Sequence, residues 1–247
     1  FTTSFAEAGE AADVHFICVG TPQQPGAYAA DMSQVFGSIS ALAPHVSSTD
    51  VIVGKSTVPV GTADEIVDQL KNTAASGVDV VWNPEFLREG FAVQDTLKPD
   101  RLVVGLASER AEQVMRSVYA PLIADGVPFL VTDFPTAELV KVAANSFLAT
   151  KISFINAMAE VCEAAGADVT MLATAIGYDP RIGNRFLSAG LGFGGGCLPK
   201  DIRAFMARAG ELGAEEALTF LREVDQINLR RREHTVDLAR KTLGGDL

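Results

Sequence analysis

The chain has 247 residues, of which 48% are hydrophobic and 21% charged, and its formal net charge at pH 7 is -11. This length suits one large domain or two small ones, and the composition is that of a soluble globular protein. The negative charge argues against nucleic acid or an acidic membrane as a partner, so an anionic ligand would need a local concentration of the few positive charges.

Short apolar runs alternate with stretches of helical spacing through the first half of the chain. The expected strands are 13–20, 50–57, 79–85, 101–105 and 127–133, and the expected helices are 29–42, 63–75 and 109–119. This alternation predicts a parallel α/β sheet. Ligands bind beyond the carboxyl ends of the strands in such sheets, where Thr21, Thr57 and Glu85 are expected.

The second half of the chain is predicted to be helical. Residues 136–165 contain no proline or glycine and predict one helix of roughly eight turns. It is apolar on nearly every side, so we expect it to be buried by protein or by a partner chain. A short helix at 168–177, an irregular glycine-rich stretch, a helix from about 198 and a charged helix at about 214–243 follow.

The cysteines Cys18, Cys162 and Cys197 are isolated, with no CxxC pair. An odd, sparse set favours free thiols in a reducing compartment, and we expect a cytoplasmic location. No apolar run approaches the roughly 18–20 residues of a membrane span, and no signal peptide is visible. The start at Phe1, without methionine, suggests an excised fragment or a processed product.

The sequence "GFGGGCLPKD" at 192–201 surrounds Cys197 with glycines and places Pro199 and Lys200 just after it. Proline suits the first turn of a helix, and a helix N-terminus beside a lysine favours the nucleophilic thiolate. We therefore predict that Cys197 is a nucleophile, and interpret Cys18 and Cys162 as small buried residues.

The same loop contains "GLGFGG" at 190–195, which matches the G-x-G-x-x-G pattern of dinucleotide-binding folds. That pattern needs a strand immediately before it, and "RIGNRFLSA" does not read as one. We therefore interpret these glycines as residues that let the backbone approach a ligand closely.

Polar residues on the long helix have two readings. Lys141 and Asn145 are four apart and share one face, and Glu138 lies three before Lys141. Glu138 and Lys141 form a structural ion pair in one reading. In the other, Lys141 and Asn145 aim a cation and an amide donor at a developing oxyanion.

Other charged residues leave their roles open on spacing alone. Glu85 or Glu89 either acts as a general base or binds a sugar hydroxyl, or is solvated. Arg181 and Arg185 either neutralise a phosphate or are solvated loop charges. Thr57, at a strand end, is a weak signal by itself.

A series of motifs occurs in the order in which one known family carries them. They are "VGTP" (19–22), "KSTVPVGT" (55–62), "NPEFLREG" (83–90), the helix and its end at 138–168, "RIGNRFL" (181–187) and "GFGGGCLPKD" (192–201). On these motifs the chain resembles the nucleotide-sugar dehydrogenases, the UDP-glucose/GDP-mannose dehydrogenase family, over nearly its whole length. It is more similar to the UDP-glucose branch than to the GDP-mannose branch, and the N-acetylmannosamine branch is more distant still.

The resemblance implies the C-terminal part of a Rossmann-type parallel sheet, at 1–134, followed by an all-helical central dimerisation domain with one long helix, at 135–247. Family members begin with a strand and a G-x-G-x-x-G loop for NAD and end with a further domain that binds UDP. We therefore expect a core fragment, inactive by itself, that forms a homodimer through the long helix.

The resemblance also implies a four-electron oxidation of UDP-glucose to UDP-glucuronate with two NAD. Cys197 adds to the aldehyde as a thiohemiacetal, oxidation gives a thioester, and water releases the glucuronate. Lys141 and Asn145 stabilise the oxyanion, and Asp201, as well as Glu85 with Thr57, orients or activates water.

Further positions match binding residues of the family, and no metal ligand is among them. The cofactor-binding matches are Thr21, Thr57, Glu89 and Lys200. The substrate-binding matches are Glu85, Phe86, Leu87, Lys141, Asn145, Arg181, Phe193 and Gly194. In similar enzymes, the residue at the position of Arg181 reaches the substrate site of the neighbouring subunit.

Three alternatives stay open. The substrate is GDP-mannose or another nucleotide sugar in the first, and this chain is a non-catalytic dimerisation core in the second. The third is a thiol acyltransferase or hydrolase that needs a histidine base near Cys197. The histidines His15, His45 and His234 are all distant from Cys197 in sequence.

Overall fold

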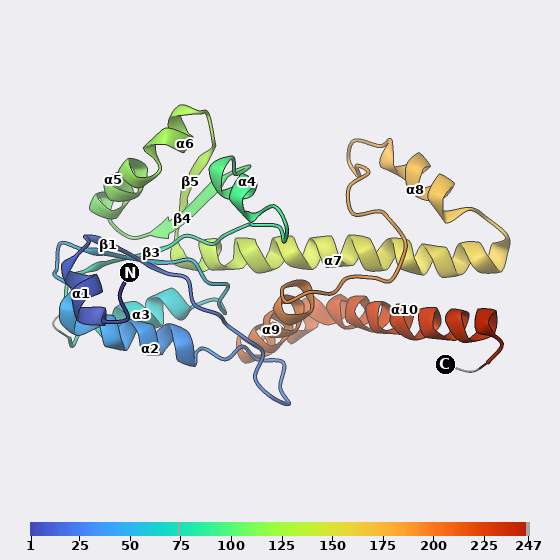
Figure 1. Cartoon of the computed structure of the whole chain (residues 1–247), viewed down its shortest axis with the longest axis horizontal. Coiled ribbons are helices and arrows are strands. Elements are labelled where there is room, and N and C mark those ends of the chain that lie inside the picture. The colour runs from blue at the N-terminus through green and yellow to red at the C-terminus, as the bar shows by residue number, and fades with distance from the viewer. Residues whose placement is uncertain (74, 246–247) are drawn as a thin grey trace. The chain divides into compact units, whose positions relative to one another are not determined.

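The computed structural model describes residues 1–73 and 75–245, so parts of the expected helix 63–75 and of the expected domain 135–247 lie outside it. The chain divides into two compact units, Phe1–Val142 and Ala143–Leu247. The division falls inside one long helix, α7 (Phe134–Ala165), which is drawn in yellow-green in Figure 1.

The first unit contains a five-stranded sheet in the order β1-β2-β3-β4-β5. Its strands are β1 (Val14–Ile17), β2 (Val51–Gly54), β3 (Asp79–Trp82), β4 (Leu102–Leu106) and β5 (Phe129–Thr132). The neighbours β1–β2, β2–β3 and β4–β5 are parallel, as expected.

The predicted parallel sheet is confirmed for three of its four strand pairs, and the fourth pair differs, since β3 and β4 are antiparallel. The chain leaves the carboxyl end of β3, forms the short helix α4 (Ala92–Leu97) and re-enters the sheet from the same edge. An antiparallel neighbour needs no crossover to the opposite edge, whereas a parallel neighbour does.

Helices cover both faces of the sheet, so β2 and β3 are buried on both sides. Ile52, Val80 and Trp82 pack with α2 and α3 on one face, and Val53 and Val81 pack with α5 on the other. This explains why these strands are continuous apolar runs. The helices and short 3-10 turn of this unit are α1 (Phe5–Glu10), α2 (Ser33–Leu42), η1 (Ala43–His45), α3 (Thr62–Leu70), α5 (Glu109–Val118) and α6 (Ala120–Ala124).

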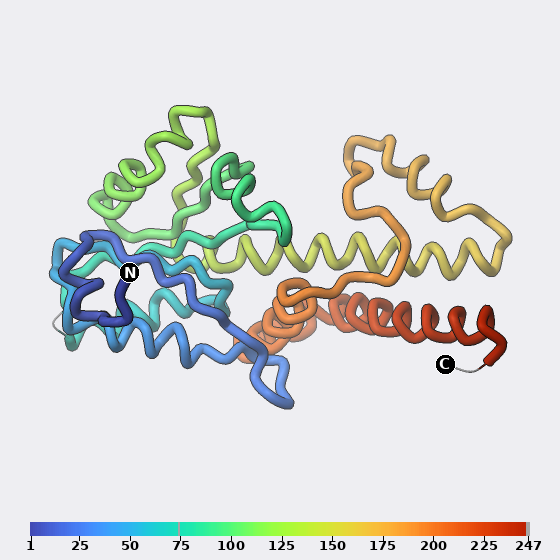
Figure 2. Tube along the Cα trace, viewed as in Figure 1, coloured from blue at the N-terminus to red at the C-terminus, as the bar shows by residue number. Residues whose placement is uncertain are grey.

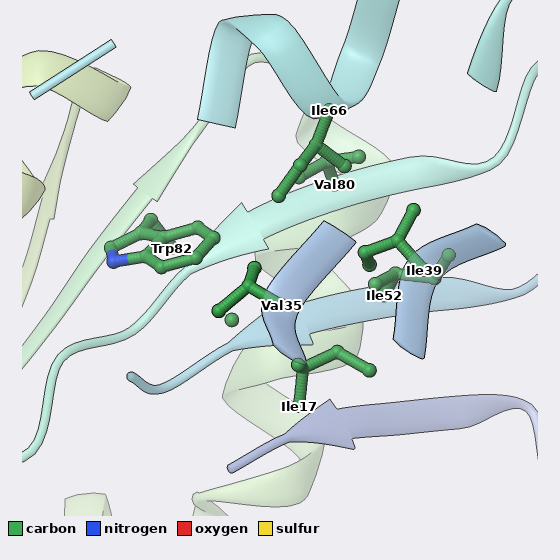
Figure 3. A pocket seen from close by; sticks show the side chains of 8 residues that line it. Ile17, Val35, Ile39, Ile52, Ile66, Val80 and Trp82 are labelled. Carbon is green, nitrogen blue, oxygen red and sulfur yellow. The ribbon is translucent and has the colours of Figure 1, made fainter. Parts of the chain in front are cut away.

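Figure 3 shows a small apolar pocket in this core, between the sheet and helices α2 and α3. A Cβ atom on Gly54 would lie 2.1 Å from the Trp82 ring, so glycine is needed beside that ring. The lining offers no charged or nucleophilic side chain, which makes the pocket part of the core rather than a place for chemistry. Its lining residues are Ile17, Val35, Ile39, Ile52, Gly54, Ile66, Val80 and Trp82.

The second unit is helical and contains the rest of α7. Its other elements are α8 (Val169–Gly177), α9 (Leu198–Glu211), the 3-10 turn η2 (Glu215–Leu218) and α10 (Thr219–Leu243). The tube in Figure 2 shows α10 running beside α7, and the Ser153 hydroxyl on α7 donates to the Val224 carbonyl on α10 at 2.7 Å. Asp168 caps α8 by accepting a hydrogen bond from the Thr170 backbone.

The apolar character of α7 is only partly explained by packing within the second unit. Ala149 and Ile155 are buried, whereas Phe147, Phe154 and Val161 are 67%, 48% and 58% exposed. These three residues are seven apart and therefore form one stripe along the helix. Among the described residues, none of the helices is both long and apolar enough to cross a membrane.

Candidate active site

The loops after β1 and β2 are cross-linked at the carboxyl edge of the sheet. The buried Thr21 hydroxyl donates to the Thr57 carbonyl at 2.7 Å, and the Ser56 hydroxyl donates to the Val19 carbonyl at 2.6 Å. The structure thus brings Thr21 and Thr57 together. They lie where parallel α/β sheets bind their ligands.

Lys141 on α7 faces the segment that follows β3. Its ammonium lies 3.2 Å from the Glu85 carboxylate and 5.5 Å from the centre of the Phe86 ring. The Lys141 side chain is 6% exposed and the Glu85 side chain 29%, so the lysine is buried and the carboxylate is reached by solvent. A buried cation beside an accessible carboxylate can stabilise an oxyanion or take part in proton transfer.

Glu138, which the sequence offered as a partner of Lys141, has a structural role. Its buried carboxylate accepts hydrogen bonds from the backbone N–H groups of Gly61 and Ala63, at 2.6 and 2.7 Å. It therefore caps the N-terminus of α3, where a negative charge is stabilising. No sequence signal pointed to this cap, because the two partners are more than 70 residues apart.

The remaining matches after β3 are exposed. The Leu87 backbone N–H donates to the Glu85 carboxylate, which fixes the turn of the chain at this point. Glu89 is exposed two residues later. The motif "NPEFLREG" thus presents two residues, Glu85 and Phe86, to the buried Lys141.

A buried polar cluster that sequence reasoning missed supports this edge. Asn83 accepts hydrogen bonds from Lys55 at 3.0 Å and from Tyr119 at 2.5 Å, and it donates to the Val103 carbonyl at 2.7 Å. Burial lowers the pKa of Lys55, and the nearby Cys18 and Glu85 partly oppose this. The Asn83 side chain therefore anchors the end of β3 just before Glu85.

In the second unit, Asn145 and Asp201 come together although they are 56 residues apart. The Asn145 amide donates to the Asp201 carboxylate at 2.6 Å, and the Lys200 ammonium donates to the other oxygen at 2.6 Å. Asp201 is 1% exposed, so its charge is stabilised by these two donors. Sequence reasoning named all three residues without predicting that they touch.

Cys197 lies where the sequence placed it, at the N-terminus of α9. It is the residue before the helix, Pro199 follows in the first turn, and its carbonyl accepts from the Asp201 backbone at 2.9 Å. The thiol residue is exposed. Cys162 is buried as expected, whereas the expected burial of Cys18 is wrong, because that residue is exposed just after β1. Because α9 makes one turn between them, Cys197 and Asp201 are neighbours on the helix.

The glycine loop before Cys197 is held by residues that sequence reasoning missed. Phe193 is buried, and its backbone N–H and C=O both bond to the Asn228 side chain, whereas Gly194 is exposed. Turns and irregular structure precede the loop, which agrees with our rejection of a dinucleotide loop here. Asn156 also holds the loop, since its side chain accepts a hydrogen bond from the Gly190 backbone. A polar residue three helical turns beyond Asn145 on the same apolar helix was the sequence signal that could have predicted this role.

Arg181 lies in the exposed segment that follows α8. Its guanidinium pairs with Asp179 at 2.6 Å, and hydrogen bonds from Arg181 lower the pKa of Asp179. Lys151 of α7 ties this segment down by donating to the Ile182 carbonyl at 2.9 Å.

Comparison with known proteins identifies the family. Residues 1–123 match the model of the UDP-glucose/GDP-mannose dehydrogenase family, NAD binding domain, and residues 135–230 match that family's central domain. UDP-glucose 6-dehydrogenase of Rickettsia felis is 43% identical over all of this chain and 54% of its own length. UDP-glucose 6-dehydrogenase YwqF of Bacillus subtilis is 41% identical over 99% of the chain and 55% of its own length.

A solved structure gives the same result. A UDP-glucose dehydrogenase of Pyrobaculum islandicum superposes with a TM-score of 0.91 at 40% identity, over 99% of this chain and 56% of that chain. The chain thus spans about half the length of the relatives it matches. The resemblance noted in the sequence is confirmed, and the chain belongs to the UDP-glucose/GDP-mannose dehydrogenase family.

Proposed function

We propose that the protein oxidises UDP-glucose to UDP-glucuronate with NAD, using Cys197 as the nucleophile. The observation that carries the proposal is the first turn of α9, where the exposed Cys197 precedes Asp201 and the Asn145 and Lys200 side chains hold that carboxylate. The relatives named UDP-glucose 6-dehydrogenase support the substrate.

The residues at the carboxyl edge of the sheet suit NAD. Thr21, Thr57 and Glu89 follow strands of the sheet: hydroxyl groups donate to phosphate and ribose oxygens, and a carboxylate accepts from ribose hydroxyls. Lys200, on α9 of the second unit, would add an ammonium donor for the cofactor. When bound, NAD supplies two successive two-electron oxidations, so that one alcohol, one water and two NAD+ become one carboxylate, two NADH and three protons.

Cys197 keeps the intermediate attached between the two oxidations. Its thiolate sulfur forms a bond to the aldehyde carbon, and the carbonyl oxygen takes a proton to give a thiohemiacetal. Loss of a hydride from the carbon, which a second NAD+ would accept, and of the hydroxyl proton leaves a thioester on Cys197. Water then breaks the C–S bond, which releases the carboxylate and restores the thiol.

The polar side chains around this chemistry have complementary roles. Lys141 and Asn145 are donors for the oxygen that becomes negative when the thiolate or water adds to the carbonyl carbon. Asp201 and Glu85, the latter with Thr57, are acceptors for the proton of the attacking water. Phe86, Leu87, Phe193 and Gly194 would shape the sugar site.

We further propose that the stripe of Phe147, Phe154 and Val161 packs against a second copy of this chain. Exposed apolar residues at a spacing of seven are typical of a helix that pairs with another helix. Arg181, on its exposed segment, would then serve the site of the neighbouring subunit. The three cysteines form no disulfide in the described part of the chain, which fits a reducing compartment such as the cytoplasm.

The test of this function is the number of NADH formed per UDP-glucose consumed by the complete protein. Two NADH per sugar are expected, and one would mean that the reaction stops at the aldehyde. If GDP-mannose gave two NADH and UDP-glucose gave none, the proposed substrate would be GDP-mannose instead of UDP-glucose. No NADH from any nucleotide sugar would leave dimerisation as the role of this chain.

A further inference from the structure

We propose that Asn228 is a positioning residue that clamps the glycine loop and thereby sets the backbone before Cys197. This inference rests on the proposed function of Cys197. Asn228 lies on α10, far from the catalytic motifs in sequence, and its side chain is 1% exposed.

The Asn228 side chain makes a two-way contact with one residue of the loop. Its carbonyl oxygen accepts from the Phe193 N–H at 2.7 Å, and its amide donates to the Phe193 carbonyl at 2.9 Å. The amide thus pairs with the loop backbone much as a neighbouring strand would. The Arg232 guanidinium donates to the same carbonyl at 2.8 Å.

A second buried asparagine holds the start of the loop from α7. Asn156, also 1% exposed, accepts from the Gly190 N–H at 2.9 Å. The Arg231 guanidinium donates to the Gly190 carbonyl at 3.3 Å. In this loop without regular structure, side chains from α7 and α10 therefore satisfy the backbone N–H and C=O groups of Gly190 and Phe193.

Gly192 shows that the loop is built around Asn228. A Cβ atom at this position would lie 2.1 Å from the Asn228 carbonyl oxygen, and the backbone there has φ +89°. Both observations require glycine. Gly192 therefore leaves room for the Asn228 side chain, in addition to any room that the substrate needs.

The clamp matters for the reaction because Phe193 is four residues before Cys197 and next to Gly194. Phe193 is also buried in a cluster with Ala149, Ile202 and Leu221, so its side chain and backbone are both fixed. A small misplacement of reacting groups costs much more rate than stability.

The test compares Asn228→Ala with Ser153→Ala in the complete protein. Ser153 is also 1% exposed and links the same two helices through its bond to Val224, but within the described part of the chain it makes no hydrogen bond to the loop. Both variants lower the melting temperature. Asn228→Ala is expected to lower kcat by at least about tenfold and to speed amide hydrogen exchange at Phe193, whereas Ser153→Ala changes neither.

The kcat and the Phe193 exchange rate of Asn228→Asp should lie between those of the wild type and of Asn228→Ala. Aspartate keeps the acceptor for the Phe193 N–H but loses the donor to the Phe193 carbonyl. If Asn228→Ala does not fold, Asn156→Ser tests the other end of the loop by the same readouts. A folded variant with unchanged kcat and unchanged exchange at Phe193 would overturn the proposal. If the wild type makes no NADH, the proposed function fails, and the exchange measurement still decides whether the clamp exists.

Discussion

At the scale of single residues, the side chains around the candidate site that are held by the most hydrogen bonds are buried polar groups with two or three partners each. Asp201 is held by Asn145 and Lys200, and Asn83 is held by Lys55 and Tyr119. A buried polar group without partners lowers the stability of the fold. Removing one member of either set is therefore expected to destabilise the others. One set lies beside Cys197 in the first turn of α9, and the other anchors the chain before Glu85.

The Tyr119 hydroxyl gives a direct readout of the second set. Burial raises the pKa of Tyr119 to about 12, and the charge of Cys18 adds to the rise. The unfolded chain releases this proton near the ordinary value of 10.0, so the contribution of Tyr119 to stability is lost as the pH rises from 10.0 to about 12.

We predict that a rapid pH jump, read by tyrosinate absorbance, shows one ionisation near pH 12 that Tyr119→Phe removes. Tyr178→Phe is the control, since Tyr178 is 85% exposed. A wild-type titration without the late step would show that Tyr119 is not buried beside Asn83.

At the scale of elements, α7 does more than carry Lys141 and Asn145. Through Glu138 it also caps α3, whose preceding residue Gly61 has φ +96°. The cap holds the end of the loop from Thr57 to Gly61 against α7, the helix that also carries Lys141. The long helix therefore fixes a strand-end loop as well as its own side chains.

We predict that Glu138→Gln lowers the free energy of unfolding by about 1–3 kcal/mol, because a charged acceptor for two backbone donors is replaced by a neutral one. Urea unfolding followed by circular dichroism measures the change. Glu65→Gln removes an exposed carboxylate from the first turn of the same helix and should have little effect. Equal losses in the two variants would contradict the capping role.

Much of this element structure was predictable from the sequence. The apolar runs predicted all five strands, and the absence of proline and glycine at 136–165 predicted α7. Sequence reasoning missed the short helices α1, α4 and α6. It also missed the antiparallel direction of β4, because local patterns do not record where a chain re-enters a sheet. The partners of Glu138 and Asn228 were missed for the same reason, since both contacts are long-range.

The candidate site was predictable to a different degree. Pro199 predicted the start of α9 beside Cys197, which the structure confirms, whereas the nucleophilic role of Cys197 stays a prediction. The spacing of Lys141 and Asn145 predicted that both lie on one helical face. The sequence did not reveal that Asn145 bonds to Asp201, or that Lys141 faces Glu85. Periodicity identifies the face of an element and leaves its tertiary partner open.

At the scale of the whole molecule, the exposed stripe on α7 is the feature that a single chain leaves unexplained. Phe147, Phe154 and Val161 expose apolar surface on a chain whose net charge of -11 would otherwise keep copies apart. A helix pair between two copies would remove this surface from water.

We predict that Phe154→Glu converts a dimer into a monomer, as measured by light scattering after size-exclusion chromatography. The introduced charge would face apolar surface without a partner. Val93→Glu makes the same change at an exposed position of α4, outside the stripe, and should leave the dimer intact. A wild-type monomer, or a dimer unaffected by Phe154→Glu, would contradict the packing.

The most direct test of the central claim is the mass of the Cys197 peptide after rapid acid quenching of turnover. The account predicts an added UDP-glucuronyl group in thioester linkage on Cys197, absent without NAD and absent in Cys197→Ser, which should also fail to produce the second NADH. An unmodified Cys197 together with a fully active Cys197→Ser variant would contradict it.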